Sequence, residues 1–510
     1  MRDESRREPT PRWYSILVPV VLLAVFAWVT YRSLPTRLAY TTLEDYSVDL
    51  VWAQQQLTHG IEWHGHFSRT LDSFHPGPLY LWILVVATWL SNLTGWFTPE
   101  LGGYYLLTYS AVLFSAAAVF TLTKASRKPA VGYGVAIALA IAQYPTASDA
   151  QHYSSARIGG WLWAPYLMPW VMLLLLCTAV TLALQWRWAP AWASAAALLA
   201  SQVYLVYAVI AVPVFFFAAF AAYKNRTDRR ARLAYLSSGI FAIPYLVRLV
   251  TEGPLFWVPR RYSLDGSTRF DYSAPGFHFE NGLQSLQLHS GLPGLVALVL
   301  ALAALVLFLV FGVRRQEHRR VLFTLAAILA LGVLQILFLY PSPLQNYQTN
   351  WTEPAWQALV GGSVALAAYR FRPSRIALPF IASLALLGML VFSHNYDPAR
   401  SISQNNDYQS AISAVKQRAG EMPVRVMDGR GLPGTIVVLT RTLRAMGVDA
   451  CHTNVQRDIA PMICPSEFVG ATLTVTNRTQ GVMTRGEVIA TTRVQRNGEQ
   501  EEFVFGFAVQ

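Results

Sequence analysis

Three acidic residues occur close together in a polar stretch, 41–82, that follows the first long apolar segment. They are Glu44, Asp45 and Asp49, and the sequence His-Pro-Gly-Pro follows at 75–78. Carboxylates beside a membrane are unfavourable unless they are solvated, paired or bound to a cation, so this cluster is a candidate for function. We interpret it as an active site. The alternative is that the three residues only cap and solvate a short surface helix.

Arginines that could bind an anion occur in two later loops and in one apolar segment. Arg157 lies in a polar loop at 145–161, and Arg260 and Arg261 lie in a second loop that begins near residue 251. Arg248 is unusual because it lies within an apolar run. An arginine at membrane depth needs an anionic partner, and a lipid phosphate is a good one. The alternative for Arg248 is that its side chain reaches the headgroup level without binding a specific ligand.

The usual metal, nucleophile and nucleotide motifs do not occur. The sequence contains no HExxH, no paired CxxC, no GxSxG and no P-loop. His64 and His66 lie near Asp72 and His75 and could hold a metal, but solvated loop histidines are the more common case. We therefore predict no metal site and no required cofactor, although a divalent cation could bind at the acidic residues. A carboxylate, a phosphate-binding cation and aromatic side chains are the groups needed to move a sugar from a lipid-phosphate donor.

The composition indicates the class of protein that carries these residues. Of the 510 residues, 54% are hydrophobic and 13% are charged, which is too apolar for a soluble protein of this size. The net charge is +12, and most of the basic residues are arginines in short clusters between apolar runs. Such clusters indicate orientation in a membrane rather than nucleic-acid binding. We therefore predict an α-helical polytopic membrane protein.

The apolar segments predict eleven membrane spans, the first of them retained with its N-terminus in the cytoplasm. The apolar segment at 79–90 does not fit the alternation of the basic connections, so we place 76–97 as a juxtamembrane or re-entrant helix on the outer face. The run at 190–222 is expected to divide at a tight external turn, 201–204. The predicted spans lie at about 16–30, 101–123, 130–144, 162–184, 190–202, 204–222, 233–250, 292–312, 321–340, 355–369 and 376–393.

The composition becomes that of a soluble domain over 394–510, whereas 1–393 forms the membrane module. Helical periodicity over 402–420 and in GTIVVLTRTLRAMG, together with alternation in VRVMDG, ATLTVTN and EVIATTRVQ, predicts a small α/β domain. After an odd number of crossings this domain faces the outside, where Cys451 and Cys464 could form a disulfide. Because it lacks a catalytic constellation, we expect it to bind an acceptor glycan or a partner protein.

Short motifs in the polar stretch occur in an order that resembles a known enzyme family. Asp45 stands eight residues before Ala53, and Gly60 and the Pro-rich 75–78 follow, the latter opening an apolar helix. This order resembles the first external loop of the membrane-embedded GT-C glycosyltransferases. That family includes enzymes that use dolichyl- or polyprenyl-phosphate sugars as donors.

Two later motifs are similar to an actinobacterial branch of that family. They are Trp163-Ala164-Pro165-Tyr166 before a long span, and Ser201-Gln202 at a later external turn. The resemblance covers about residues 10–390. It implies a transferase of cell-wall biogenesis that moves arabinofuranose or mannose from a polyprenyl-phosphate donor to an envelope glycan, lipid or protein.

The resemblance also implies a role for individual residues. Asp45 matches the family's catalytic aspartate, a general base, and Asp49 one helical turn later would orient the acceptor or bind a cation. For Gln202 and Tyr204 the alternative is that they are ordinary residues of a tight turn. The residues implied for the donor phosphate are Arg157, Arg248, Arg260 and Arg261, and those implied for the cavity or acceptor are Glu44, His75, Trp163, Gln202 and Tyr204.

Two other classes of function compete with a glycosyltransferase. A transporter or flippase of a lipid-linked sugar would also need many spans, but it should show internal repeats and polar residues in the middle of its spans. A non-enzymatic scaffold would account for the C-terminal domain but not for the acidic stretch. We therefore expect a multi-pass protein of the plasma (inner) membrane whose active site and C-terminal domain lie on the extracytoplasmic side. The sugar, the acceptor and the linkage stay open.

Overall fold

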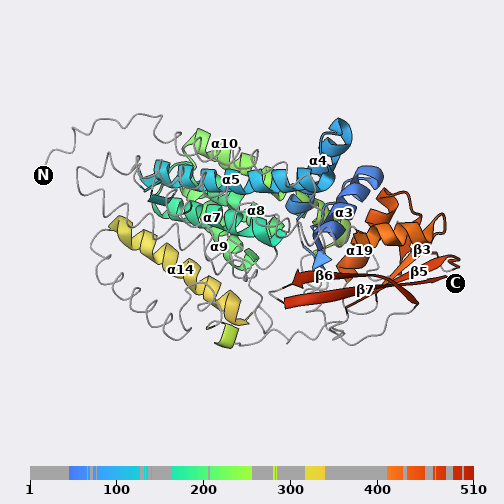
Figure 1. The fold of residues 1–510 in the computed structure, drawn as a ribbon. Coiled ribbons are helices and arrows are strands. Elements are labelled where there is room, and N and C mark those ends of the chain that lie inside the picture. The colour runs from blue at the N-terminus through green and yellow to red at the C-terminus, as the bar shows by residue number, and fades with distance from the viewer. Residues whose placement is uncertain are drawn as a thin grey trace, which may run out of the picture.

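The structure is a computed structural model of the 510-residue chain, with a mostly helical part and an α/β part (Figure 1). The residues that it describes are 45–65, 67–68, 73–75, 77–126, 131–132, 134–135, 139, 164–204, 207–254, 279–281, 283, 316–338, 410–428, 433–453, 463–465, 467–477, 486–496 and 499–509. The described helical part ends at residue 338, and the α/β part begins at residue 410.

The helical part is a bundle of apolar helices that pack around α7. Met168, Val171 and Leu175 on α7 are fully buried, because this helix is apolar all round and contacts α5 and α8. The helices are α3 (Asp45–His59), α4 (Leu79–Thr94), α5 (Pro99–Ser126), α7 (Ala164–Ala183), α8 (Ala189–Val203), α9 (Ala208–Lys224), α10 (Arg229–Ser238), α11 (Ile243–Glu252) and α14 (Gln316–Phe338), with the 3₁₀ helix η3 (Gly239–Ala242) between α10 and α11.

Several of these helices could cross a membrane. Among the described residues, three segments are long and apolar enough by length and composition, namely Pro99–Ser126, Arg229–Glu252 and Arg319–Phe338. Shorter apolar helices occupy Leu79–Thr94, Leu167–Ala183 and Ala208–Lys224. Helices are therefore present at the predicted spans 101–123, 162–184, 190–202, 204–222, 233–250 and 321–340. The spans at 16–30, 292–312, 355–369 and 376–393 lie outside the described residues, and 130–144 is described only at isolated positions, so the total of eleven stays a prediction.

The turn between α8 and α9 lies a few residues later than predicted. Helix α8 continues to Val203, and the extended residue Tyr204 ends it, whereas the sequence predicted a turn at 201–204. Ser201 is still helical, and its Oγ donates to the Ala197 carbonyl at 3.0 Å. The connection therefore runs from Tyr204 to Tyr207, and Gln202 lies in the last turn of α8.

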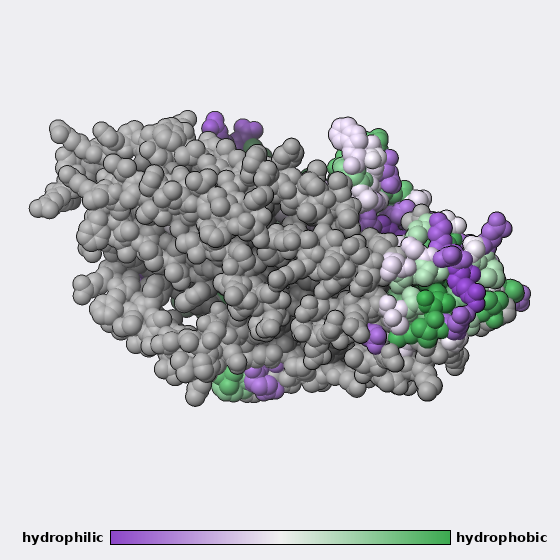
Figure 2. Space-filling view, viewed as in Figure 1, coloured by the Kyte–Doolittle hydropathy of each residue, from purple (hydrophilic) through white to green (hydrophobic). Residues whose placement is uncertain are grey.

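Helix α4 forms in the segment predicted as an outer juxtamembrane helix. It has 16 residues and is therefore about 24 Å long, which is short for a membrane core of about 30 Å. It projects from the bundle at the end where α3 and the C-terminal domain lie (Figure 1). Val86, Trp89 and Leu93 are exposed on it, and Trp96 follows its end at Gly95. Exposed residues at this end of the molecule include both hydrophobic and hydrophilic ones (Figure 2).

The C-terminal domain is a five-stranded mixed sheet with the order β4-β3-β5-β7-β6. A helix at 410–419 precedes β3, and α19 (Pro433–Ala445) connects β3 to β4. The strands β3 and β4 pair in parallel. Apolar side chains of both helices and of β3 and β5 form its core, as the predicted periodicity requires. The predicted boundary at 393/394 lies outside the described residues. The strands are β3 (Val424–Asp428), β4 (Ala450–His452), β5 (Ala471–Asn477), β6 (Glu487–Arg496) and β7 (Glu499–Val509).

Candidate active site

Helix α3 carries the two aspartates to which the sequence analysis gave catalytic roles. Asp49 is buried at 4% exposure, and the Tyr80 hydroxyl donates a hydrogen bond to its Oδ2 at 3.0 Å. Tyr80 is itself buried and lies in the first turn of α4. Asp45 is the first residue of α3, and a spacing of four places it on the same helical face as Asp49. The side chain of Asp45 lies outside the described residues.

The sequence of α3 explains why Asp49 is directed inward. Its buried residues include Asp49, Trp52, Ala53 and Gln56, which recur at the three- and four-residue spacing of one helical face. Polar residues such as Thr58 cover the exposed side. The helix ends before Gly60, whose φ of 114° is a conformation that residues with a side chain rarely adopt. Asp49 therefore lies on the face that α3 turns toward its neighbours.

A short segment, His75–Tyr80, connects Asp49 to the rest of the site. Its first residue is buried, and the His75 carbonyl accepts a hydrogen bond from the Gly65 amide at 2.8 Å. The His75 ring lies against the Tyr204 ring, with 4.7 Å between centroids. At Gly77 a Cβ would collide with the side chain of Gln202, so this close approach requires glycine. The segment 75–80 is therefore packed directly on the end of α8.

Arg248 also contacts this segment, and it is paired with a carboxylate. Its side chain is 4% exposed, and Nε and Nη2 donate to the two carboxylate oxygens of Glu252 at 2.7 and 2.6 Å. A third bond runs from Nη1 to the His75 carbonyl at 3.1 Å. Bidentate pairing fixes the plane of the guanidinium. Arg248 thus binds the backbone of the segment and is paired with a carboxylate that is 42% exposed.

A break in the apolar helix that contains Arg248 supplies another contact. Between α10 and α11 the chain forms the 3₁₀ turn η3, because Pro244 has no N–H to donate to the carbonyl four residues earlier. The carbonyl of Phe241 in this turn accepts from Gln202 Nε2 at 2.6 Å. Nearby, Ser201 Oγ and Tyr245 Oη lie 2.7 Å apart. The end of α8 is thereby joined to both the segment 75–80 and the helix of Arg248.

The structure thus brings four of the predicted residues around one segment of six residues, which itself contains a fifth. Since a chain extends by at most about 3.6 Å per residue, the Cα atoms of His75 and Tyr80 are at most about 18 Å apart. The five are Asp49, His75, Gln202, Tyr204 and Arg248. Six other predicted side chains lie outside the described residues, so their positions stay predictions. They are Glu44, Asp45, Arg157, Trp163, Arg260 and Arg261.

Sequence reasoning did not assign a role to several of the contacting residues. Glu252 could have been found, because a glutamate four residues after an arginine lies on the same helical face. Tyr80 and Gly77 could not, since each meets a partner that is far away in the sequence. The contact with the Phe241 carbonyl could not be found either, because a backbone carbonyl does not depend on the residue type.

Within the described residues there is no group of three or more His, Cys, Asp and Glu side chains that could hold a metal ion. His64, which the sequence placed near a candidate metal site, has Nε2 3.0 Å from Glu62 and Nδ1 2.9 Å from the Gly65 carbonyl. His66 and Asp72 lie outside the described residues. The described carboxylates of the site are Asp49 and Glu252, and each is hydrogen-bonded to a neighbouring side chain.

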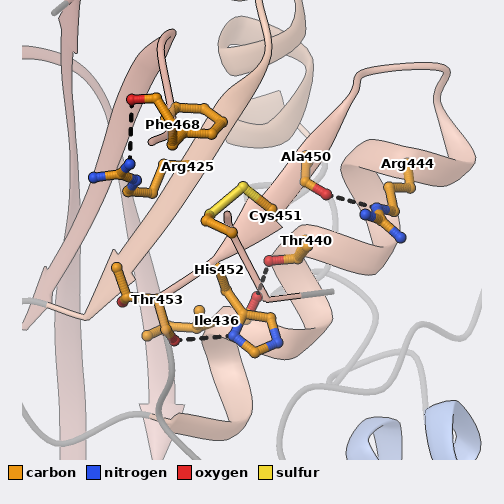
Figure 3. Close-up of a disulfide and its surroundings, with 10 residues drawn as sticks. Arg425, Ile436, Thr440, Arg444, Ala450, Cys451, His452, Thr453 and Phe468 are labelled. Carbon is orange, nitrogen blue, oxygen red and sulfur yellow. Dashed lines mark hydrogen bonds between the residues drawn. A yellow bond between two sulfur atoms is a disulfide. The ribbon is translucent and has the colours of Figure 1, made fainter. Parts of the chain in front are cut away.

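The polar residues of the C-terminal domain make structural contacts (Figure 3). Cys451 and Cys464 are joined by a disulfide. His452 Nδ1 lies 3.0 Å from the Thr453 carbonyl, and burial lowers the pKa of the imidazole. Arg425 donates to the Phe468 carbonyl at 3.3 Å and lies over the Phe468 ring. Within the part of the domain that the structure describes, these contacts stabilise the sheet and its loops.

Comparison with known proteins gives one similar structure. No protein-family model and no curated protein matches this chain. The chain is similar to the crystal structure of ArnT from Cupriavidus metallidurans bound to undecaprenyl phosphate, with 12% sequence identity and a TM-score of 0.46. The similarity covers 97% of this chain and 98% of that one.

Proposed function

We propose that the protein is a membrane glycosyltransferase that moves a sugar from a polyprenyl-phosphate donor to an acceptor of the cell envelope. The observation that carries the proposal is the convergence of a buried carboxylate, a buried arginine and aromatic rings on the segment 75–80. Asp49 contacts one end of this segment, and Arg248 and Tyr204 contact the other. A carboxylate and a cation on either side of a reacting sugar are what such a transfer requires.

In the proposed reaction an acceptor hydroxyl attacks the anomeric carbon of the donor. The new glycosidic C–O bond forms as the bond between the anomeric carbon and the phosphate oxygen breaks, and polyprenyl phosphate leaves. Asp45 takes the proton of the acceptor hydroxyl as general base, while Asp49, held by Tyr80, orients the acceptor. Arg248 stabilises the charge on the departing phosphate, together with Arg157, Arg260 and Arg261.

Other side chains of the site would hold the lipid or the sugar. The rings of His75 and Tyr204 contact each other at an angle of 39° and would contribute aromatic surface, and Gln202 fixes the end of α8. Glu44 and Trp163 complete the proposed cavity. No step requires a cofactor, and a divalent cation at Asp45 and Asp49 is the alternative to direct acceptor binding by Asp49. Arabinofuranose and mannose are the favoured sugars, on a glycan, lipid or protein acceptor outside the plasma membrane.

A reconstituted transfer assay tests this proposal. Purified protein in detergent receives a polyprenyl-phosphate sugar and an acceptor oligosaccharide, and product is followed by mass spectrometry. Wild-type protein should transfer the sugar, and Asp45→Asn should lower turnover by a factor on the order of 10² to 10⁴, the usual contribution of a positioned base. Asp449→Asn is the matched control, because this residue is exposed, belongs to the C-terminal domain and has no role in the proposed site, so turnover should be unchanged.

Two results would contradict the proposal. Full activity in Asp45→Asn would remove the assigned base. Movement of labelled lipid-linked sugar across a liposome membrane, without transfer to any acceptor, would favour a transporter or flippase instead.

A further inference from the structure

Helix α19 is firmly attached to the C-terminal sheet. Ile436, Leu439 and Leu443 of this helix are fully buried in the core of the domain. Near its end Arg444 Nε donates to the Ala450 carbonyl at 2.6 Å, at the start of β4. The next residue of that strand is Cys451, which the disulfide fixes (Figure 3). Since packing and a hydrogen bond connect helix and sheet, α19 moves with its domain as one unit.

The same helix also contacts the helical part of the protein. α19 packs against α3, and Figure 1 shows the two helices side by side. Beside this contact Arg441 of α19 pairs with Glu100 in the first turn of α5, with 2.5 Å between Nη2 and Oε1. The two side chains are 21% and 16% exposed. Solvent and salt weaken such a pair less than an exposed one, and the N-terminus of α5 also favours the carboxylate.

A second ion pair in the domain provides a comparison. Arg418 and Glu487 lie 2.6 Å apart, but their side chains are 56% and 65% exposed, and both belong to the C-terminal domain. Exposed pairs of this kind contribute little to stability. Among the ion pairs of the described residues, the one between Arg441 and Glu100 joins the domain to the helical bundle.

Helix α3 depends on its neighbours for stability. It has 15 residues, and a helix of this length is only marginally stable by itself. It contacts α4, through the bond between Asp49 and Tyr80 among others, and it also contacts α19. Displacement of α19 would therefore remove one of the packed surfaces that hold α3.

We infer that the C-terminal domain positions α3, and that Arg441 is the positioning residue through which it does so. Docking of α19 by the pair Arg441–Glu100 holds α3, and with it Asp45 and Asp49, against α4. The domain thus acts on the active site in addition to any binding of acceptor or partner. The effect on catalysis rests on the proposed function, whereas the docking itself does not.

Hydrogen exchange of the full-length protein in detergent tests the docking. In Arg441→Gln the amides of 45–59 should exchange roughly tenfold faster, because one packed side of α3 is loosened. Glu100→Gln, on α5, should accelerate exchange at 45–59 to the same extent, because it removes the other partner of the pair. Exchange in the double variant should be no faster than in either single variant, because all three variants remove the same interaction. Arg418→Gln is the control and should exchange like the wild type. If one single variant does not fold, the other is measured in its place, because the two substitutions lie on separate elements.

Steady-state kinetics of the same variants test the positioning role. If α3 shifts, turnover should fall on the order of tenfold while KM for the donor stays close to the wild-type value, because misplacement of a base affects chemistry more than binding. Unchanged exchange at 45–59 in folded Arg441→Gln would overturn the docking, and additive effects in the double variant would overturn the pairing. Faster exchange with unchanged turnover would overturn the positioning role. If the wild type transfers no sugar, the proposed function fails, and exchange alone still decides whether the domain holds α3.

Discussion

The substitution Glu252→Gln should lower the stability of the protein and raise its affinity for the donor. Glu252 is the bidentate partner of Arg248, whose side chain is 4% exposed. Removal of one partner from a fully buried pair costs about 3–5 kcal/mol, because the other charge is left uncompensated. Glutamine keeps one oxygen acceptor and Glu252 is 42% exposed, so we expect a smaller loss of about 2 kcal/mol. Thermal unfolding in detergent should show it as a lower melting temperature.

The effect on the donor has the opposite sign. If Arg248 binds the donor phosphate, the carboxylate of Glu252 competes with that phosphate for the guanidinium. Its removal should therefore lower KM for the polyprenyl-phosphate sugar by about tenfold, which corresponds to about 1.4 kcal/mol. Glu487→Gln is the matched control, because its partner Arg418 is exposed, and neither melting temperature nor KM should change.

The two measurements separate the possible roles of Arg248. A lower melting temperature with unchanged or higher KM would refute the assignment of the phosphate to Arg248, and would leave this arginine as a structural residue that holds His75. An unchanged melting temperature would refute the reasoning that the loss of Glu252 leaves the buried charge of Arg248 uncompensated. The assay therefore tests a catalytic role and a structural role with one substitution.

Three further predictions concern other parts of the molecule. Asp49→Asn should reduce turnover less than Asp45→Asn in the transfer assay, because a residue that orients the acceptor contributes less than the base that takes its proton; an equal or larger loss would reverse the two roles. Replacement of both Cys451 and Cys464 by serine should destabilise the C-terminal domain by roughly 3 kcal/mol, measured by denaturant unfolding, and two free thiols in the unreduced wild type would contradict it. Gln56→Met should raise the melting temperature, since both polar atoms of this buried amide make no hydrogen bond to any described residue and such a group costs about 1–3 kcal/mol; a lower melting temperature would show that Gln56 has a polar partner.

The sequence predicts those features that repeat over a short distance. Apolar runs locate α5, α7, α9 and α14, and alternation locates β3, β5 and β6, because both patterns follow from which face of an element is buried. Strand β7 was not predicted from the sequence. A single arginine in an apolar run is visible for the same reason, and Arg248 is indeed buried. The end of α8 was misplaced by a few residues, because Ser and Gln in the middle of an apolar run read as a turn. In the structure Ser201 bonds to its own helix and Gln202 to Phe241.

Contacts between distant parts of the chain are what the sequence does not predict. Asp49 and Tyr80 are 31 residues apart, and His75 and Arg248 are 173 residues apart. Which residues meet at such separations depends on how whole helices pack, and no local pattern records it. The arginine was therefore expected to need an anion, but the identity of that anion as Glu252 came only from the structure.

The backbone of the segment 75–80 has as much influence on the site as its side chains. Arg248 binds the carbonyl of His75, and Gln202 packs where Gly77 has no side chain. The first contact does not depend on the side chain of His75, and the second requires that position 77 has none, so both depend on the path that the backbone follows there. Pro78 restricts that path by fixing φ directly after the glycine. The segment thus contacts Gln202 at Gly77, Arg248 at His75 and Asp49 at Tyr80, which gives its backbone a physical role before any role in chemistry.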